Sequence, residues 1–518
     1  MNQKDNKKMK DKILFWFGVD FTDFCMSYYL KDMHNSDFYA IVDITNKPKK
    51  FFQEQKLVPF KKTWYFHDHI NSKKKADLEY LSTFEKKYNI DLWKLAINER
   101  LFYRFFDFHK FTRDEILSID EDACRLFESV LDEVKPDYII TKEPVLHHLE
   151  IFYELCRARG IKVLMLSIPK IGFRCMISDQ SQRISTDTNL KEIQVKDRSV
   201  EELRGFVEEY SPSRSILKVI KNARKPLGIS KKTTIIAGIK YFLLNCSKNV
   251  KTNYNYFGRT KFKVFKHSLD SMLKEKYRRS FMDKSLVTNV DYSSKFVYFP
   301  LGVDMERNIL VAAPFFTNQV EIIRHIAKSL PVGYQLYVKE APAAATRSWR
   351  EISVYKEIMD IPNVTLIHPN VKSEKLLENC KIVSTVGGST GFQATFYKKP
   401  TIIFSETVYS ILPSVFQVKD VRVLPNVIKK AIETRVDISD LDRYITLIDD
   451  NTFEFDLYQL QNNFTKMFYY NGTLIDTNID EAEVEIFLKK NKNMLSFLAE
   501  RYQEKIEESK NVSKKTKL

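Results

Sequence analysis

The hydrophobic and polar positions of the chain predict two α/β blocks, and the clearer one lies between Asn363 and Phe404. Three short apolar runs predict strands, at Val364–Ile367, Lys381–Val386 and Pro400–Phe404. Helical spacing predicts a helix over Ser373–Asn379 and another from Phe392 to Tyr397. The alternation of strands and helices is typical of a parallel sheet covered by helices.

The same pattern occurs at the start of the chain and upstream of Asn363. Further strands are predicted at Lys12–Phe17, Phe38–Asp43, Asp137–Thr141, Ile161–Ser167, Phe296–Pro300 and Tyr334–Lys339. Helices are predicted around Phe24–Leu30, within Leu78–Phe108, and over Asp114–Val134, Val145–Arg159, Val320–Ser329, Ser348–Asp360 and Ile486–Glu508. We therefore expect an α/β protein with two Rossmann-like domains.

Four regions are expected along the chain. They are an N-terminal Rossmann-like domain at 1–205, a basic helical insertion at 206–290, a C-terminal Rossmann-like domain at 291–430, and C-terminal helices with a basic tail at 431–518.

Positive charge is concentrated in the insertion. The chain of 518 residues has a formal net charge of +16, and Ser211–Met282 alone contains 18 Lys or Arg and 2 acidic residues. Such a segment binds phosphate groups of lipid, nucleic acid or substrate. Within it, Thr233–Asn245 is apolar but too short to span a bilayer. It either lies in the membrane interface with lysines on head groups or forms a core helix with a solvated basic face. No nucleic-acid-binding module is recognisable, so we expect an anionic membrane surface and no nucleic acid as partner.

The remaining composition predicts the compartment. The six cysteines form no CxxC motif, no long apolar run follows the basic N-terminus, and no stretch reaches the roughly 18 apolar residues of a membrane span. We expect a reduced, cytoplasmic protein, peripheral at the inner face of the cell membrane.

The glycine-rich sequence GGSTG, Gly387–Gly391, is the strongest candidate for chemistry. Glycines let the backbone approach a ligand closely and adopt positive φ. Ser389 and Thr390 add hydroxyl groups, and the helix that follows directs its amides to the same place, which suits a phosphate. The sequence fits neither a dinucleotide-binding nor a Walker motif, and a tight connection that binds nothing remains the alternative.

Other polar residues follow predicted strands, where open α/β sheets bind ligands. Asp20, Lys142 and Glu143 are in such positions, although solvated loop residues would look the same. The histidine pairs at 67/69 and 147/148 have no third ligand at a suitable spacing, so we expect surface or capping roles and no metal site.

Five motifs carry a resemblance to a known family. They are FPLGVDME (Phe299–Glu306), APFFTNQ (Ala313–Gln319), LPVGYQLYVKEAP (Leu330–Pro342), NVTLIHP (Asn363–Pro369) and VGGSTGFQATFYKKPTIIF (Val386–Phe404). In order and spacing they resemble capsule polysaccharide biosynthesis proteins, which are surface-glycan glycosyltransferases of the two-domain GT-B type. The N-terminal half is similar only in its pattern.

The resemblance implies a GT-B architecture and a sugar transfer. The C-terminal domain would bind a nucleotide-sugar donor, and the N-terminal domain a polysaccharide or lipid-linked glycan acceptor. No cofactor or metal is expected, because backbone amides, helix dipoles and basic side chains neutralise the leaving nucleotide in such enzymes.

The resemblance also implies roles for individual residues. Donor phosphates would contact Gly388, Ser389, Thr390, Gly391, Lys339 and Arg347. The base and ribose would contact His368 and Gln393. The candidate catalytic groups are Glu340, in the same cleft, and Asp20, in an N-terminal loop where a carboxylate could act as general base.

Two positions depart from the family pattern. Ala341 stands where the family commonly has histidine, and Gln393 where it commonly has glutamate. An alanine side chain cannot hydrogen-bond a substrate, whereas glutamine keeps the shape of glutamate without its charge. Two rival functions therefore stay open: a non-catalytic nucleotide- or glycan-binding scaffold of a capsule assembly complex, and a sugar epimerase or polyol-phosphate transferase on the same fold.

Overall fold

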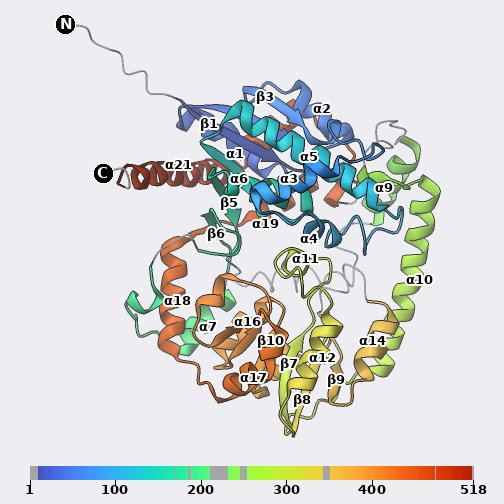
Figure 1. Cartoon of the computed structure of the whole chain (residues 1–518), viewed down its shortest axis with the longest axis vertical. Coiled ribbons are helices and arrows are strands. Elements are labelled where there is room, and N and C mark those ends of the chain that lie inside the picture. Colours follow the sequence, from blue (N-terminus) through green and yellow to red (C-terminus); the bar gives the residue numbers. More distant parts are fainter. Residues whose placement is uncertain are drawn as a thin grey trace.

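The computed structural model describes residues 10–169, 171–184, 188–209, 231–244, 254–341, 350–472 and 474–515. Two largely parallel sheets form the cores of two halves, one above the other in Figure 1. The predicted class is confirmed: an α/β protein with two Rossmann-like domains in a GT-B arrangement, a helical insertion and a helical C-terminus.

The N-terminal sheet has the strand order β13-β6-β5-β4-β1-β2-β3. Its strands are β1 (Asp11–Phe17), β2 (Ser36–Val42), β3 (Phe60–Tyr65), β4 (Tyr138–Lys142), β5 (Lys162–Ser167), β6 (Arg174–Ser178) and β13 (Phe453–Glu454). Strands β1 to β5 are parallel, β6 pairs antiparallel with β5, and β13 pairs antiparallel with β6. The edge strand β3 was not predicted, because its sequence FKKTWY is half exposed and carries two lysines.

Helices cover both faces of this sheet. They are α1 (Thr22–Met33), α2 (Asn46–Glu54), α3 (Leu78–Tyr88), α4 (Leu92–Ile97), α5 (Arg113–Val134) and α6 (His147–Ala158), with the 3₁₀ turn η1 (Phe66–Asp68). A capping box begins α5: Thr112 accepts from the amide of Glu115, whose side chain accepts from the amide of Thr112.

The C-terminal sheet has the order β12-β11-β10-β7-β8-β9, and all of its pairs are parallel. Its strands are β7 (Lys295–Pro300), β8 (Tyr334–Lys339), β9 (Val364–Ile367), β10 (Ile382–Thr385), β11 (Thr401–Ile403) and β12 (Val415–Gln417). Its helices are α11 (Arg307–Leu310), α12 (Gln319–Ser329), α14 (Ile352–Met359), α15 (Ser373–Asn379), α16 (Ser389–Phe396) and α17 (Leu424–Glu433). Counted along the chain, the strand order is the 3-2-1-4-5-6 order of a dinucleotide-binding fold.

The last helices return to the N-terminal sheet. They are α19 (Leu457–Phe468), α20 (Glu481–Lys490) and α21 (Lys492–Lys515), and they are reached through α18 (Ile438–Asn451). Phe464 and Tyr502 share a buried core with Phe15 and Phe17 of β1. The single helix predicted over Ile486–Glu508 is divided, because the Asn491 side chain bonds the carbonyl of Phe487 and ends α20.

The chain also crosses the other way. The 3₁₀ turn η2 (Leu190–Glu192) and α7 (Val200–Glu209) precede the insertion but pack on the C-terminal half. Leu190 and Leu203 share a buried core with Phe392 of α16 and Tyr444 of α18. Each half therefore includes a segment that is separated from the rest of that half in the sequence: α19 to α21 in the N-terminal half, and η2 and α7 in the C-terminal half.

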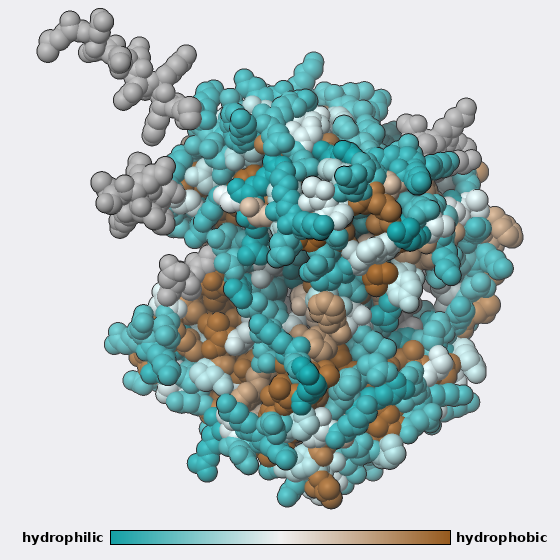
Figure 2. Space-filling model, viewed as in Figure 1, coloured by the Kyte–Doolittle hydropathy of each residue, from teal (hydrophilic) through white to brown (hydrophobic). Residues whose placement is uncertain are grey.

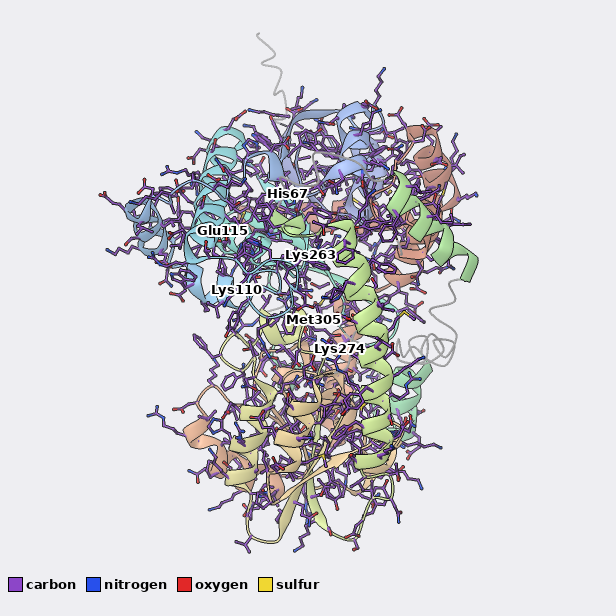
Figure 3. All side chains as sticks on the ribbon, turned by 90° about the vertical axis from the view of Figure 1, so that its right-hand side faces the viewer. His67, Lys110, Glu115, Lys263, Lys274 and Met305 are labelled. Atoms are coloured by element: carbon purple, nitrogen blue, oxygen red, sulfur yellow. The ribbon has the colours of Figure 1, made fainter. Side chains whose placement is uncertain are left out.

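The described part of the insertion is helical, as predicted. It comprises α9 (Lys231–Leu244), the 3₁₀ turn η5 (Tyr254–Tyr256) and α10 (Lys261–Ser285). Helix α10 runs along one side of the molecule from the upper half to the lower half (Figures 1 and 3). Residues 210–230 and 245–253 of the predicted basic segment lie outside the described residues.

Candidate functional site

The C-terminal sheet has its candidate site where the strand order reverses. Strands β7 and β10 are neighbours, but the chain leaves β7 toward β8 on one side and leaves β10 toward β11 on the other. Open α/β sheets bind ligands at such switch points, outside the carboxyl ends of the strands. The GGSTG sequence follows β10 and therefore reaches this position.

The GGSTG sequence forms the start of α16. Gly388 is the N-cap residue with extended backbone, and Ser389 is exposed at the first helical position. The first amides of a helix have no acceptor within it, and the helix dipole adds partial positive charge there. This end of α16 can therefore bind an anion. The prediction that the helix begins at Phe392 was wrong by three residues, since Ser389, Thr390 and Gly391 already belong to its first turn.

The glycines provide space rather than unusual backbone angles. Gly387, Gly388 and Gly391 do not have positive φ, so that prediction was wrong. A Cβ on Gly387 would lie 2.0 Å from the Ser405 Oγ, and one on Gly391 would lie 2.7 Å from the Tyr409 Oη. Tyr409 also donates a hydrogen bond of 2.6 Å to the carbonyl of Gly388. The segment after β11 thus packs directly on the turn, which leaves no room for side chains.

Lys339 ends β8 and is 2% exposed. Its Nζ donates a hydrogen bond of 2.8 Å to the Ser373 Oγ at the start of α15. Burial lowers the pKa of Lys339 to about 8, although Glu374 and Glu340 partly oppose that effect. Within the described ranges, no carboxylate forms an ion pair with this lysine. A buried cation without a paired anion suits the predicted phosphate contact, which stays a prediction.

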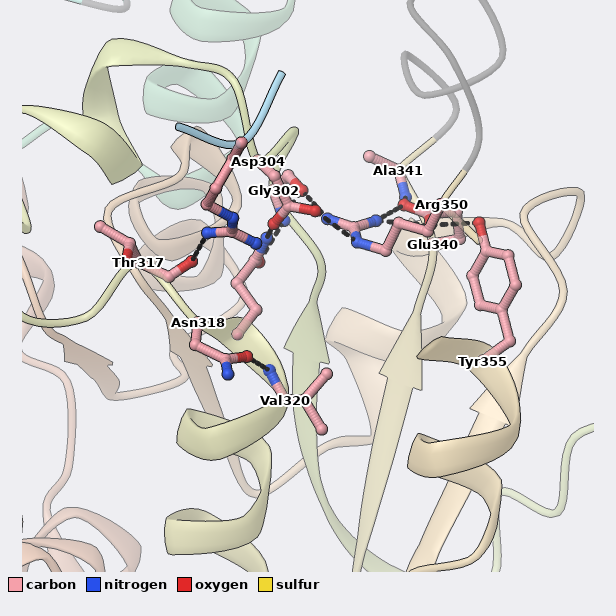
Figure 4. A network of polar contacts seen from close by, with 11 residues as sticks. Gly302, Asp304, Thr317, Asn318, Val320, Glu340, Ala341, Arg350 and Tyr355 are labelled. Atoms are coloured by element: carbon pink, nitrogen blue, oxygen red, sulfur yellow. Dashed lines mark hydrogen bonds and ion pairs between the residues drawn. The ribbon is translucent and has the colours of Figure 1, made fainter. Parts of the chain in front are cut away.

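Glu340 lies in a buried polar network between the loops after β7 and β8 (Figure 4). Arg350 donates to its carboxylate at 2.6 Å, forms an ion pair of 3.0 Å with Asp304 and donates to the carbonyl of Gly302. Tyr355 donates to the second Glu340 oxygen at 2.7 Å. Burial alone would lower the pKa of Arg350, but Glu340 and Asp304 raise it well above its ordinary value. These contacts hold the loops together, and a catalytic role of Glu340 stays a prediction.

The predicted nucleoside contacts belong to different elements, since His368 follows β9 and Gln393 lies in α16. His368 faces the insertion, with its Nε2 3.1 Å from the Asp283 carboxylate of α10 and its Nδ1 accepting from the amide of Asn370. Gln393 is half-buried one turn into α16. Arg347 lies outside the described residues. Their binding roles stay predictions.

The N-terminal sheet has its own switch point, between β1 and β4. Asp20 follows β1 and Lys142 ends β4, and their side chains form an ion pair across the switch point. The Asp20 carboxylate also accepts from the amide of Thr22 at 3.1 Å and from the Gln461 side chain of α19 at 3.2 Å. The structure thus joins two of the three strand-end residues singled out in the sequence. Glu143, the third, instead binds Gln182.

A buried carboxylate, Asp23, lies beside this pair. It is 2% exposed, and neither oxygen has a hydrogen-bond partner among the described residues. Burial raises the pKa of Asp23 to about 7, with Lys142 opposing and Asp20 adding to the shift. A pKa near neutrality suits proton transfer. Asp23 was not predicted from the sequence, because an aspartate in the first turn of a helix is an ordinary dipole partner.

Two histidines extend the charged cluster. His67 and His148 each lie 2.9 Å from a different oxygen of Asp43, which follows β2. Burial alone would raise the pKa of Asp43, but these imidazoles hold it well below its usual range. Tyr254 of the insertion covers His148, with 3.3 Å between its hydroxyl and the Nδ1. The expected surface or capping roles were therefore wrong for both histidines, which are buried.

His147 is also buried, between Glu99 at 3.3 Å and Asp120 at 3.2 Å. Burial would lower its pKa, but the two carboxylates raise it to about 9. Across the described ranges, no group of three or more His, Cys, Asp or Glu is arranged to hold a metal ion.

The two halves meet near both switch points. Arg307 of α11, after β7, donates to the carbonyl of Pro144, after β4, at 2.7 Å and to the Ser181 hydroxyl. Asn98 donates to the carbonyl of Pro314 at 3.0 Å. Met305 lies between the halves in Figure 3. Sequence patterns gave no signal for Arg307, because a four-residue helix such as α11 is too short to show a periodic pattern.

A cavity of about 870 Å³ lies between the halves, and its lining does not include the contacts of Arg307 and Asn98. Its lining includes Asp137, Lys162, Arg183, Thr407, Ser410 and Lys505. Asp137 and Lys162 lie at the beginnings of β4 and β5, so the cavity opens at the opposite edge of the N-terminal sheet from Asp20.

Comparison with known families adds to these observations. Residues 243–413 match the model of a family described as capsule polysaccharide biosynthesis protein. The match contains all five motifs named above, so the resemblance is confirmed over this segment, which is less than half of the chain. A search of curated proteins found no match.

Solved structures give distant matches. The UDP-GlcNAc 2-epimerase of Methanocaldococcus jannaschii aligns at 14% identity and a TM-score of 0.24, over 85% of this chain and 99% of that one. The KpsC β-Kdo 2,7 transferase of Thermosulfurimonas dismutans aligns at 11% identity and a TM-score of 0.27, over 70% of this chain and 97% of that one. The KpsC β-Kdo 2,4 transferase of the same organism aligns at 11% identity and a TM-score of 0.28, over 60% of this chain and 79% of that one. Likeness at this level says nothing about activity.

Proposed function

We propose that this protein is a GT-B glycosyltransferase that helps to build a capsular or other surface polysaccharide. The observation that carries the proposal is the start of α16, which lies at the switch point of a dinucleotide-type sheet, within the segment that matches the capsule family. The amides of Ser389 and Thr390 there donate to no residue that the structure describes, whereas those of Gly388 and Gly391 are hydrogen-bonded. There the amides and hydroxyls of Ser389 and Thr390 would bind the phosphates of a nucleotide-sugar. Lys339 and Arg347 would add positive charge, and His368 and Gln393 would contact the nucleoside.

The acceptor would bind at the charged switch point of the N-terminal half. A carboxylate there, Asp20 or its neighbour Asp23, would take the proton of an acceptor hydroxyl. The acceptor oxygen would then bond to the anomeric carbon while the bond from that carbon to the phosphate oxygen breaks. The nucleotide would leave with the bonding electrons, and the α16 amides and Lys339 would stabilise its charge without a metal ion or other cofactor.

The test removes one amide from the proposed donor site. Ser389 is the first helical position, where proline is tolerated, and Gly388 before it already has the extended backbone that proline requires. Ser389→Pro therefore deletes an N–H donor while keeping α16, and Ser389→Ala deletes only the hydroxyl. In a thermal-shift screen with CMP, UDP, GDP, CDP and dTDP, we expect one nucleotide to raise the Tm of the wild type. The shift should shrink in Ser389→Ala and almost vanish in Ser389→Pro. A screen without any shift, or equal shifts in all three proteins, would contradict the donor site.

A non-catalytic scaffold is the second candidate, because Ala341 lacks the hydrogen-bonding side chain that the family commonly has there. The protein is incubated with sugar derivatives of the nucleotide that raised the Tm, with and without glycan acceptors, to separate the glycosyltransferase, the epimerase and the scaffold. Transfer to an acceptor supports the glycosyltransferase, and a changed sugar without acceptor supports an epimerase. Nucleotide binding without turnover supports the scaffold.

The proposed acceptor places the protein at the inner face of the cell membrane as a peripheral protein. Of the helices that the structure describes, none is both long enough and apolar enough to cross a bilayer. The basic insertion is the part of the chain suited to such a position.

A further inference from the structure

Helix α10 carries a long stripe of exposed apolar side chains. The stripe consists of Phe262 (75% exposed), Phe265 (56%), Leu269 (49%), Met272 (64%), Leu273 (60%) and Tyr277 (71%). Their spacings of three and four residues place them along one face of the helix. Isolated exposed apolar residues are ordinary, but a continuous row on one helix marks an interaction surface.

The opposite face of α10 fixes the helix to both halves. His267 packs on Phe108 of the N-terminal half with ring centroids 5.2 Å apart. Arg278 forms an ion pair with Glu351, and Met282 is buried in the core of the C-terminal half. The apolar stripe therefore points outward from a helix whose other side is held in place.

Helix α9 widens the same surface. Ile236, Ile239 and Leu243 are about half or more exposed, at spacings of three and four residues. Phe242 meets Phe265 of α10 edge to face at 6.2 Å, so the two helices adjoin. Pale-brown side chains reach the right-hand edge of the molecule in Figure 2, where Figure 1 shows α9 and α10.

Lysines lie within and beside the stripe and indicate the partner. From Lys261 to Ser285 there are eight Lys or Arg and three acidic residues. Lys266, Lys274 and Lys276 are exposed and form no ion pair with any residue that the structure describes. Unpaired lysines are depleted at protein interfaces, whereas an apolar stripe between lysines is typical of helices that lie on anionic membranes.

We infer that α9 and the outward face of α10 dock on an anionic lipid bilayer, with the apolar stripe among the acyl chains and the lysines on lipid phosphates. This inference rests on the proposed function in one respect: a lipid-linked acceptor would give the protein a reason to be at a membrane. Since α10 runs along both halves, docking through its outward face would hold both halves beside the same membrane surface (Figure 3). It also narrows the sequence expectation, which assigned the membrane contact to the whole basic segment Ser211–Met282.

Vesicle flotation with the full-length protein tests the inference. The vesicles contain phosphatidylcholine either alone or mixed with phosphatidylglycerol. Binding should require phosphatidylglycerol and weaken with salt. Phe265→Glu/Leu269→Glu/Leu273→Glu should abolish it, and Lys266→Glu/Lys274→Glu/Lys276→Glu should lower the partition coefficient by about a hundredfold. Val332→Glu, at a fully exposed apolar residue outside the insertion, is the matched control and should bind like the wild type.

Three outcomes would overturn the inference: no binding by the wild type, equal binding by the apolar triple variant, or a dimer in solution that this variant dissociates. The last would make the stripe an interface between copies. The nucleotide-induced Tm shift of the triple variant is measured in parallel. If the triple variant keeps the nucleotide-induced Tm shift, it is folded, and its loss of vesicle binding concerns the membrane surface alone. If only Ser389→Pro loses the Tm shift, that loss concerns the donor site. Failure of one proposal can therefore be told from failure of the other.

Discussion

The switch points of the two sheets share a topology and differ in chemistry. In the N-terminal half, the strand ends gather charged side chains, with Asp20 paired to Lys142 and Asp23 buried beside them. In the C-terminal half, GGSTG presents amides and hydroxyls at the start of a helix. Strand order fixes where a ligand can bind, and residue type decides which ligand. The charged site suits proton transfer, and the amide site suits an anion such as a phosphate.

The C-terminal half also has charges at its strand ends, but it uses them differently. Arg350, Glu340 and Asp304 satisfy one another inside the protein and join two loops. Their charges are compensated within the fold, whereas Asp23 has no hydrogen-bond partner in the described chain. Substitutions at these positions test the contrast between compensated and uncompensated buried charges.

The largest effect is expected from Arg350→Met. The substitution leaves Glu340 and Asp304 without their cation, and breaking a buried pair in this way costs about 3–5 kcal/mol of unfolding free energy. Urea unfolding followed by circular dichroism measures this loss of unfolding free energy. Arg279→Met, which removes an exposed pair with Glu275, is the control and should change stability by less than about 1 kcal/mol. Adding Glu340→Met should recover part of the loss, because both partners are then apolar. Equal, small losses in both single variants would show that the network is not structural.

The next largest effect concerns pH and Asp23. Its pKa is about 7 in the folded protein and has the ordinary value of about 4 in the unfolded chain. Between these pH values the folded state binds more protons, so the free energy of unfolding falls as pH rises, by up to about 4 kcal/mol. Asp23→Asn cannot ionise and should flatten this dependence in urea titrations, whereas Asp20→Asn, which removes a neighbouring charge that adds to the pKa shift, should only weaken it. Parallel curves for the wild type and Asp23→Asn would mean that the carboxylate is not protonated in the folded protein.

The sequence predicted the fold well where periodicity was strong. All six strands predicted upstream of Asn363 are present within a few residues, and so is the alternation around GGSTG. Strand β3 was missed because its exposed lysines interrupt the apolar pattern. The return of α19 to α21 to the N-terminal sheet had no local signal, because their apolar faces fit either sheet equally well.

The sites were predictable in position but not in partners. Asp20 and GGSTG could be assigned to strand ends from the sequence, since topology alone puts them there. The link between Asp43 and its two histidines depends on three connections converging at one edge of the sheet. The need for Gly387 depends on Ser405, 18 positions later, packing above it.

An intermediate effect is expected from Gly387→Ala. The new Cβ would lie 2.0 Å from the Ser405 Oγ, so overpacking should lower stability by about 1–3 kcal/mol. Gly387→Ala/Ser405→Ala removes the clashing oxygen and should recover most of it. Gly205→Ala, in α7 with no atom within 4 Å, is the control and should be neutral or slightly stabilising. If Gly387→Ala is as stable as the wild type, the fold does not require the close packing around GGSTG.

The smallest effect on stability is expected from Lys339→Met, and it has the opposite sign. Burial disfavours the charged lysine, so its removal should raise the free energy of unfolding by about 1 kcal/mol near neutral pH. The same change should weaken nucleotide binding about tenfold, because a charge-assisted hydrogen bond to phosphate is lost. Lys375→Met, at an exposed lysine of α15, is the control and should alter neither quantity much. The pKa of about 8 adds a signature: wild-type nucleotide affinity should fall as pH rises through that value, and the affinity of Lys339→Met should not. A gain in stability without a loss of affinity would make this lysine a packing residue and leave the amides of α16 as the whole of the described phosphate site.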